Sequence, residues 1–335
     1  MNRIVIETIL KKAIRDIKDS PERSTRNLID FALQFTKGEF QQRFLEQTQR
    51  ILQDENSPYY KMVYDAVNNV DTDKLICLGT NICYNSCTLG AEKIRNIEEK
   101  EGFDIPWSLA FDMGDASSEQ YETIIEQGNG LGIYTWFIRT ENLENVAPLV
   151  KKHTDSAFIL LCEPETVLNT MNQTILKAKN VMLCPAYDEN DTTCTKACQY
   201  LRENRMLFSV HYIYGDQNAK FILNGDVMVS AQNLHPMFVL LVPDENCSAE
   251  VIKAVYDYAL HVRENQEYLA VPWEYCTDNS YFDSIISDNP CLAGFDAKGD
   301  LQTISSKKYG NDYNLFCNSL AEILKKVFPK KRAMA

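Results

Sequence analysis

The sequence of 335 residues contains no apolar run long enough to cross a membrane. Its longest apolar runs, residues 157–162 and 237–242, are far shorter than the roughly 20 residues that a membrane-spanning helix requires. The first residues mix apolar side chains with Lys11, Lys12 and Arg15, which is unlike the apolar core of a signal peptide. These absences lead us to expect a soluble, cytoplasmic protein with no membrane partner.

Positive charge is also scarce. The chain has 34 Lys and Arg against 47 Asp and Glu, which gives a formal net charge of -13. The electric field around such a protein repels phosphate backbones, so nucleic acid is excluded as an expected partner. The basic residues gather at 325–332, where we expect the solvated end of a last helix.

Common catalytic motifs are missing as well. The sequence has no phosphate-binding loop, no dinucleotide-binding glycine pattern, no nucleophile elbow and no His-Glu-x-x-His. Any activity must therefore depend on other residues and on the architecture that places them.

Cysteine, in contrast, is frequent: eleven are present. In a cytosolic protein they are expected to be reduced, and such thiols are buried in the core, bind a metal or take part in catalysis. Cys194 and Cys198 lie four residues apart on one helical face, and with Cys184 they could form a zinc site, although core packing is favoured. His211, on an expected strand, is interpreted as a core histidine or as a side chain that points into a barrel.

The first 70 residues or so have helical periodicity, with Ser57-Pro58 as a helix start. Their apolar stripes predict packing on the rest of the protein, with a partner-docking surface as the alternative.

From residue 74 onward, short apolar runs alternate with helical segments, which is typical of a parallel sheet with crossover helices. We expect strands near 74–79, 106–112, 132–138, 156–162, 180–184, 207–214, 238–243 and 268–272. We expect helices near 88–100, 117–128, 144–152, 165–177, 192–204 and 248–265. Residues 221–229 look like a hairpin that turns at Asn224-Gly225.

Three segments carry a resemblance to a known family. After the expected strand at 74–79, residues 81–90 hold Cys83 and Cys87. After the next strand comes Met113-Gly114-Asp115. Near the end, residues 287–301 and 319–324 combine a cysteine, a tight hairpin and a short helix. Together these segments resemble radical S-adenosylmethionine (radical-SAM) proteins of the type that carries a SPASM extension.

The resemblance implies a fold, cofactors and sites. The fold would be α/β, a partial TIM-type (β/α)6 barrel over residues 73–275, with a helical region at 1–72 and a SPASM-like region at 276–335. A [4Fe–4S] cluster would be bound by Cys83, Cys87 and a third ligand, for which Cys77 is the nearby candidate. S-adenosylmethionine would bind near Met113, Gly114 and Asp115, where the family has Gly-Gly-Glu. Gly90 stands where the third cysteine of the family pattern belongs.

Two functions stay open. In the first, the cluster site is degenerate and the protein binds a peptide or a protein partner without complete radical-SAM chemistry. In the second, the protein is an active radical-SAM enzyme that uses a non-standard cluster site to modify a peptide or small molecule. A Cys77 that is buried in the barrel core would favour the first.

Overall fold

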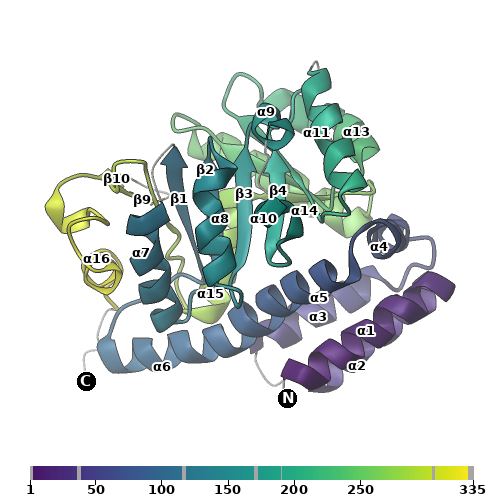
Figure 1. Ribbon diagram of the computed structural model, residues 1–335, viewed down its shortest axis with the longest axis horizontal. Helices are drawn as coiled ribbons and strands as arrows, with labels where there is room; N and C mark the ends of the chain where they lie inside the picture. Colours follow the sequence, from purple (N-terminus) through teal and green to yellow (C-terminus); the bar gives the residue numbers. More distant parts are fainter. Residues whose placement is uncertain are drawn as a thin grey trace. The chain divides into compact units, whose positions relative to one another are not determined.

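The computed structural model describes residues 3–35, 39–114, 118–169, 173–189, 191–303 and 306–330. It has a mixed α/β architecture with parallel strands and many helices, which confirms the expected class (Figure 1). The chain divides into two compact units: residues 1–80, 163–169 and 182–278 form the first, and the remainder forms the second. Within the described ranges, no helix combines the length and the apolarity that crossing a membrane would require.

The second unit is built on a sheet in which the strands follow the order β10-β9-β8-β1-β2-β3. Its centre is three parallel strands: β1 (Ser108–Gly114), β2 (Thr135–Thr140) and β3 (Ala157–Cys162). On the other side of β1, β8 (Ala293–Phe295) is also parallel, and β9 (Leu301–Thr303) and β10 (Lys307–Lys308) follow as antiparallel edge strands. The expected C-terminal hairpin is thus confirmed.

Helices α7 (Ser118–Leu131) and α8 (Leu143–Lys152) cover one face of these strands (Figure 1). The contact is close, because a Cβ atom added at Gly128 of α7 would lie 2.2 Å from the ring of Trp136 on β2. The ring of Phe111 on β1 lies 5.3 Å from Tyr121 and 5.4 Å from Trp136. Phe111 and Trp136 therefore project from the strand face that α7 covers, and their chain neighbours project from the opposite face.

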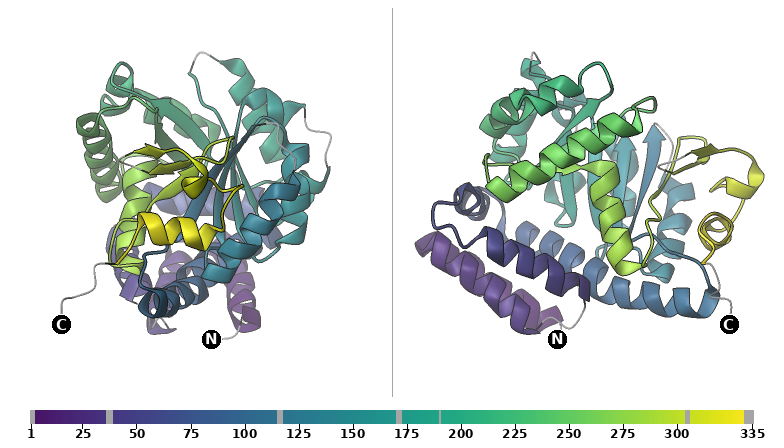
Figure 2. Two further views of the ribbon diagram at one scale, coloured as in Figure 1. Left: turned by 90° about the vertical axis from the view of Figure 1, so that its left-hand side faces the viewer. Right: turned by 180° about the vertical axis from the view of Figure 1, so that it is seen from behind.

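The first unit contains a second parallel sheet, in which β6 (Phe238–Pro243) lies between β5 (Val210–Tyr214) and β7 (Val271–Glu274). Strand β4 (Val181–Pro185) leads into this unit, where Leu183 and Phe208 form a parallel bridge. Helix α14 (Ala249–Asn265) packs on β7, as the right-hand view of Figure 2 shows. The strands expected between 106 and 272 are therefore confirmed.

The N-terminal helices also belong to the first unit, and they pack on one another around two small apolar clusters. One cluster joins Ile14, Ile17, Val67 and Ile76. The helices are α1 (Arg3–Asp19), α2 (Pro21–Phe35), α3 (Glu39–Ile51), α4 (Pro58–Asn69) and α5 (Thr72–Thr80). The Ser57 side chain accepts a hydrogen bond from the Tyr59 N–H and so begins α4 as predicted.

The remaining helices complete both units. They are α6 (Ala91–Glu101), α9 (Pro164–Leu168), α10 (Gln173–Lys177), α11 (Thr192–Glu203), α12 (Ala219–Leu223), α13 (Asp226–Ala231), α15 (Tyr275–Ile286) and α16 (Leu320–Val327), with 3-10 turns η2 (Gln232–Leu234) and η3 (Asn311–Tyr313).

The hairpin expected at 221–229 is wrong. That segment forms the two short helices α12 and α13 instead. Gly225 does adopt the positive φ expected of an Asn-Gly pair, at 84°, but here this conformation links two helices.

Candidate functional site

The strand expected at residues 74–79 is wrong: this segment is helix α5. It is followed directly by the π-helix η1 (Asn81–Gly90) and then by α6, so residues 72–101 are helical throughout. The expected loop that carries Cys83 and Cys87 after a first strand is therefore absent from this part of the chain.

Local interactions explain why residues 72–80 are helical. The Asp71 carboxylate accepts hydrogen bonds from the backbone N–H groups of Asp73 (2.9 Å) and Lys74 (3.2 Å), as an N-cap residue does. Ile76 is then buried in the cluster with Ile14 of α1 and Val67 of α4. A five-residue apolar run fits a strand or a helix equally well, and the cap at Asp71 is the sequence signal that distinguishes them.

The π-helix η1 is held at the amino-terminal ends of β2 and β3. The Asn81 amide donates to the carbonyl oxygens of Thr154 and Ser156, at 2.9 Å each, just before β3 begins. The Asn85 amide donates to the Asp155 carbonyl at 2.8 Å, and the hydroxyl oxygens of Ser86 and Thr135 lie 2.7 Å apart. Ligand sites of α/β proteins gather at the carboxyl ends of the strands, so η1 lies at the opposite edge.

The three predicted metal ligands differ in environment. Cys77 on α5 is half-buried, Cys83 on η1 is exposed and Cys87 on η1 is buried. Burial, and to a smaller extent the neighbouring Cys83, raise the pKa of the Cys87 thiol well above its ordinary value. A thiol that resists ionisation is a poor metal ligand, because the thiolate is the binding form.

A [4Fe–4S] cluster of the expected type would need three thiolates at one site. Across the described ranges, no three His, Cys, Asp or Glu side chains are grouped so that they could hold a metal ion. We therefore derive no chemical step through a cluster.

The predicted cofactor segment lies at the carboxyl end of β1. Met113 is 1% exposed and belongs to the strand face that carries Leu109 and Phe111, so its side chain does not block the end of the strand. Gly114 has φ +48°, and a Cβ atom added there would meet no atom of the described residues within 4 Å. Asp115 lies outside the described residues. Among the described residues, none occupies the space beside the Gly114 Cα atom where a side chain would project.

Asp112 and Arg139 are register partners on the parallel strands β1 and β2, near the carboxyl ends. Asp112 is half-buried, and its carboxylate accepts a hydrogen bond from the Gly114 N–H at 3.0 Å, while Arg139 is exposed. Side chains of register partners project from the same face of a sheet. We call Asp112, Gly114 and Arg139 the β1–β2 end. Sequence reasoning missed Arg139, which a single charge within an apolar strand could have indicated.

Two further polar residues, Glu163 directly after β3 and His211 on β5, lie elsewhere in the fold. Glu163 is the N-cap residue of α9, with Pro164 at its first position. His211 is 4% exposed, and its Nδ1 atom lies 2.8 Å from the Cys184 carbonyl oxygen, which fits the core-histidine interpretation.

The thiols of Cys184, Cys194 and Cys198 are all buried in the first unit. Hydrogen bonding to Cys194, followed by burial, raises the pKa of the Cys198 thiol. This environment agrees with core packing and disfavours the thiolates that zinc would require.

No family model and no curated protein matches the sequence. Among solved structures, SuiB of Streptococcus suis bound to S-adenosylmethionine aligns with a TM-score of 0.49 and 11% identity, over 70% of this chain and 66% of SuiB. AnSMEcpe with bound AdoMet aligns with a TM-score of 0.41 and 10% identity, over 66% of this chain and 83% of that one. A Bradyrhizobium enolase complexed with magnesium and mandelic acid aligns with a TM-score of 0.32 and 10% identity, over 86% of this chain and 83% of the enolase. This chain thus spans slightly less than two thirds of the length of SuiB.

Proposed function

We propose that the protein is a radical-SAM-like binding protein that does not perform cluster-dependent chemistry. Its ligand, a peptide or a small molecule with an amino-acid group, would bind at the β1–β2 end. The observation that carries this proposal is the pairing of Asp112 with Arg139 beside the open backbone of Gly114.

The chemistry of the β1–β2 end suits an amino-acid group. The guanidinium of Arg139 can bind a carboxylate through two parallel hydrogen bonds, and the carboxylate of Asp112 can accept from an ammonium group. Gly114 supports close approach, since no side chain projects from it. S-adenosylmethionine and the termini of peptides both present such groups.

Calorimetric titration with S-adenosylmethionine and with a panel of short synthetic peptides tests the proposal. We expect at least one of these ligands to bind, and Arg139→Met and Asp112→Asn each to weaken binding by about tenfold, the effect of one charge-assisted hydrogen bond. Lys151→Met, which removes an exposed charge from the end of α8, is the matched control and should leave affinity unchanged.

Two outcomes would overturn the proposal. One is that the wild type binds none of these ligands, or that the Arg139 and Asp112 variants bind every ligand with the same affinity as the wild type. The other is reductive cleavage of S-adenosylmethionine by the anaerobically purified protein, which would support the enzyme alternative instead.

A further inference from the structure

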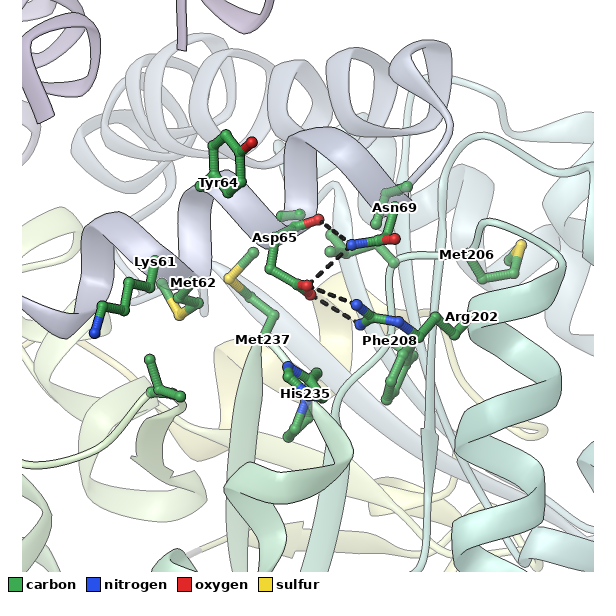
Figure 3. Close-up of a pocket in the computed structure, with 15 residues that line it drawn as sticks. Lys61, Met62, Tyr64, Asp65, Asn69, Arg202, Met206, Phe208, His235 and Met237 are labelled. Carbon is green, nitrogen blue, oxygen red and sulfur yellow. Dashed lines mark hydrogen bonds and ion pairs between the residues drawn. The ribbon is translucent and has the colours of Figure 1, made fainter. Parts of the chain in front are cut away.

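The first unit contains a cavity of about 270 Å³ that is separate from the β1–β2 end (Figure 3). It is formed by α4, by Arg202 of α11 and by the chain segments that enter β5 and β6. The cavity therefore lies at the amino-terminal ends of these strands, and it shares no residue with the β1–β2 end.

The interior of the cavity is apolar and adaptable. Three thioether side chains, Met62, Met206 and Met237, line it together with the ring of Phe208. Methionine side chains adjust to ligands of irregular shape, and sulfur makes favourable contacts with the edges of aromatic rings. The Lys74 ammonium contacts the Met206 sulfur at 2.8 Å and so fixes one wall. Such an interior favours an aromatic ligand.

The rim of the cavity has an excess of positive charge, although the protein as a whole carries -13. Arg202 pairs with both carboxylate oxygens of Asp65, at 2.9 and 2.6 Å, and Asn69 donates to Asp65 at 2.9 Å, so the one acidic group of the lining is already neutralised (Figure 3). Lys61 and His235 are both exposed and belong to the lining of the cavity. An anionic group of a ligand could therefore pair with a cation of the lining, because the Asp65 carboxylate is already paired with Arg202.

The backbone at the rim is also unusual. His235 has φ +58°, a left-handed conformation that few side chains adopt, and Pro236 follows it directly. The His235 N–H donates to the Gln232 carbonyl at 3.0 Å, which holds this conformation at the end of η2. This left-handed cap ends η2 and fixes where His235 leaves the helix.

We propose that this cavity binds a small aromatic molecule that carries one anionic group. The ring lies among the three methionines, and the anion lies at the rim beside Lys61 and His235. The site is independent of the β1–β2 end and of the function proposed for it.

A pair of dyes tests the proposal directly. The probe is 8-anilinonaphthalene-1-sulfonate, an aromatic monoanion, and its control is N-phenyl-1-naphthylamine, which has the same rings without the sulfonate. We expect one sulfonate dye to bind per chain, with at least about fivefold higher affinity than the neutral dye, because an exposed ion pair contributes about 1 kcal/mol. Phenylacetate should displace the dye from the wild-type protein.

Variants locate the site. Met62→Trp fills the cavity and should abolish binding of both dyes, whereas Phe221→Trp, on a half-exposed part of α12 outside the cavity, should leave binding unchanged. Lys61→Met should weaken the sulfonate dye about fivefold and leave the neutral dye unaffected; Lys12→Met on α1 is its control.

The outcomes separate cleanly. Equal affinity for the two dyes in the wild type would refute anion recognition, and unchanged dye binding by Met62→Trp would refute the cavity as the site. Should Met62→Trp fail to fold, failure of phenylacetate to displace the dye from the wild type would equally overturn the proposal.

Discussion

The ammonium group of Lys330 lies 3.0 Å from the carboxylate of Glu98, a side chain that is 1% exposed. The same ammonium lies 3.4 Å from the carboxylate of Asp104, which is also buried. The chain on either side of the contact is tied down, since the Asp104 N–H donates to the Phe328 carbonyl at 2.8 Å and the Lys330 N–H donates to the Gly102 carbonyl at 3.0 Å. The end of the described chain is therefore fastened to the second unit by one cation between two buried acids.

Removal of this cation should destabilise the protein. In Lys330→Met the buried Glu98 carboxylate keeps its hydrogen bond from the Ile105 N–H but loses its ion pair. We expect a loss of about 1–3 kcal/mol in the free energy of unfolding, measured by urea denaturation of the whole chain. Lys326→Met removes a cation whose partner Asp312 is 75% exposed, and it should cost less than about 0.5 kcal/mol. Equal effects of the two substitutions would contradict the importance of burial.

The stability of the protein should also depend on pH through Asp283, a buried acid near Glu98. Burial raises the pKa of the Asp283 carboxyl well above its ordinary value, and the neighbouring Glu98 raises it further. The native state then holds a proton that the unfolded state releases above its ordinary pKa of about 4. The stabilisation is present below that pH and is lost as pH rises through the raised value.

Asp283→Asn tests this sign. Its side-chain oxygen can still accept from the Trp107 N–H, a bond of 2.9 Å in the wild type, but it carries no ionisable group. Relative to the wild type, the variant should gain about 1–3 kcal/mol at pH 8 and little at pH 4, as measured by thermal unfolding at both pH values. Asp312→Asn, at an exposed position, should show no such difference, and a wild-type advantage at pH 8 would reverse our interpretation.

The amide of Asn81 should be essential to the placement of η1. It is fully buried, and in Asn81→Ala the carbonyl oxygens of Thr154 and Ser156 lose its donated hydrogen bonds. We expect a loss of about 1–3 kcal/mol, and a larger loss for Asn81→Asp, because a carboxylate would face those carbonyl oxygens. Asn68→Ala, which removes a more exposed amide from α4, is the control. In Asn81→Ala, amide hydrogen exchange should become faster than in the wild type within η1. An equal increase in the exchange rate across the whole protein would contradict this prediction.

The sequence predicted the sheet better than the helices that precede it. The apolar runs at 157–162 and 238–243 became β3 and β6: all six residues of β3 and the three central residues of β6 are buried, as expected for strands of a parallel sheet. The run at 75–79 had the same composition but became helical, because Asp71 caps it and because α1 and α4 offer an apolar surface to one helical face. Tertiary partners of this kind are not visible in a local pattern.

The predicted site residues also divide into those that follow from local sequence pattern and those that depend on contacts distant in sequence. Gly114 was placed correctly at the end of a strand, since strand ends follow from the alternation of elements. The segment with Cys83 and Cys87 was not predicted correctly. Its helix η1 depends on hydrogen bonds from the amides of Asn81 and Asn85 to carbonyl groups about 70 residues later in the chain, which a local pattern does not reveal. Lys330 was expected in solvent and instead pairs with Glu98, a contact that joins residues far apart in sequence.

The thiol arrangement makes a final prediction about iron. Reductive chemistry on S-adenosylmethionine would require three thiolates around one cluster, yet the side chains of the described residues offer no group of three metal ligands. We therefore expect protein purified anaerobically, and then exposed to iron and sulfide, to contain well below one cluster per chain. Cys77→Ser and Cys83→Ser should leave both the iron content and the thermal unfolding midpoint unchanged, because neither residue belongs to the buried core. Cys87→Ser changes a buried position of η1 and serves as the contrast. A loss of about 1 kcal/mol in the free energy of unfolding should lower its unfolding midpoint by a few degrees. Its iron content should not change. Stoichiometric iron in the wild type that is lost in Cys77→Ser or Cys83→Ser would instead require η1 to rearrange into a cluster-binding loop, and it would restore the enzyme alternative.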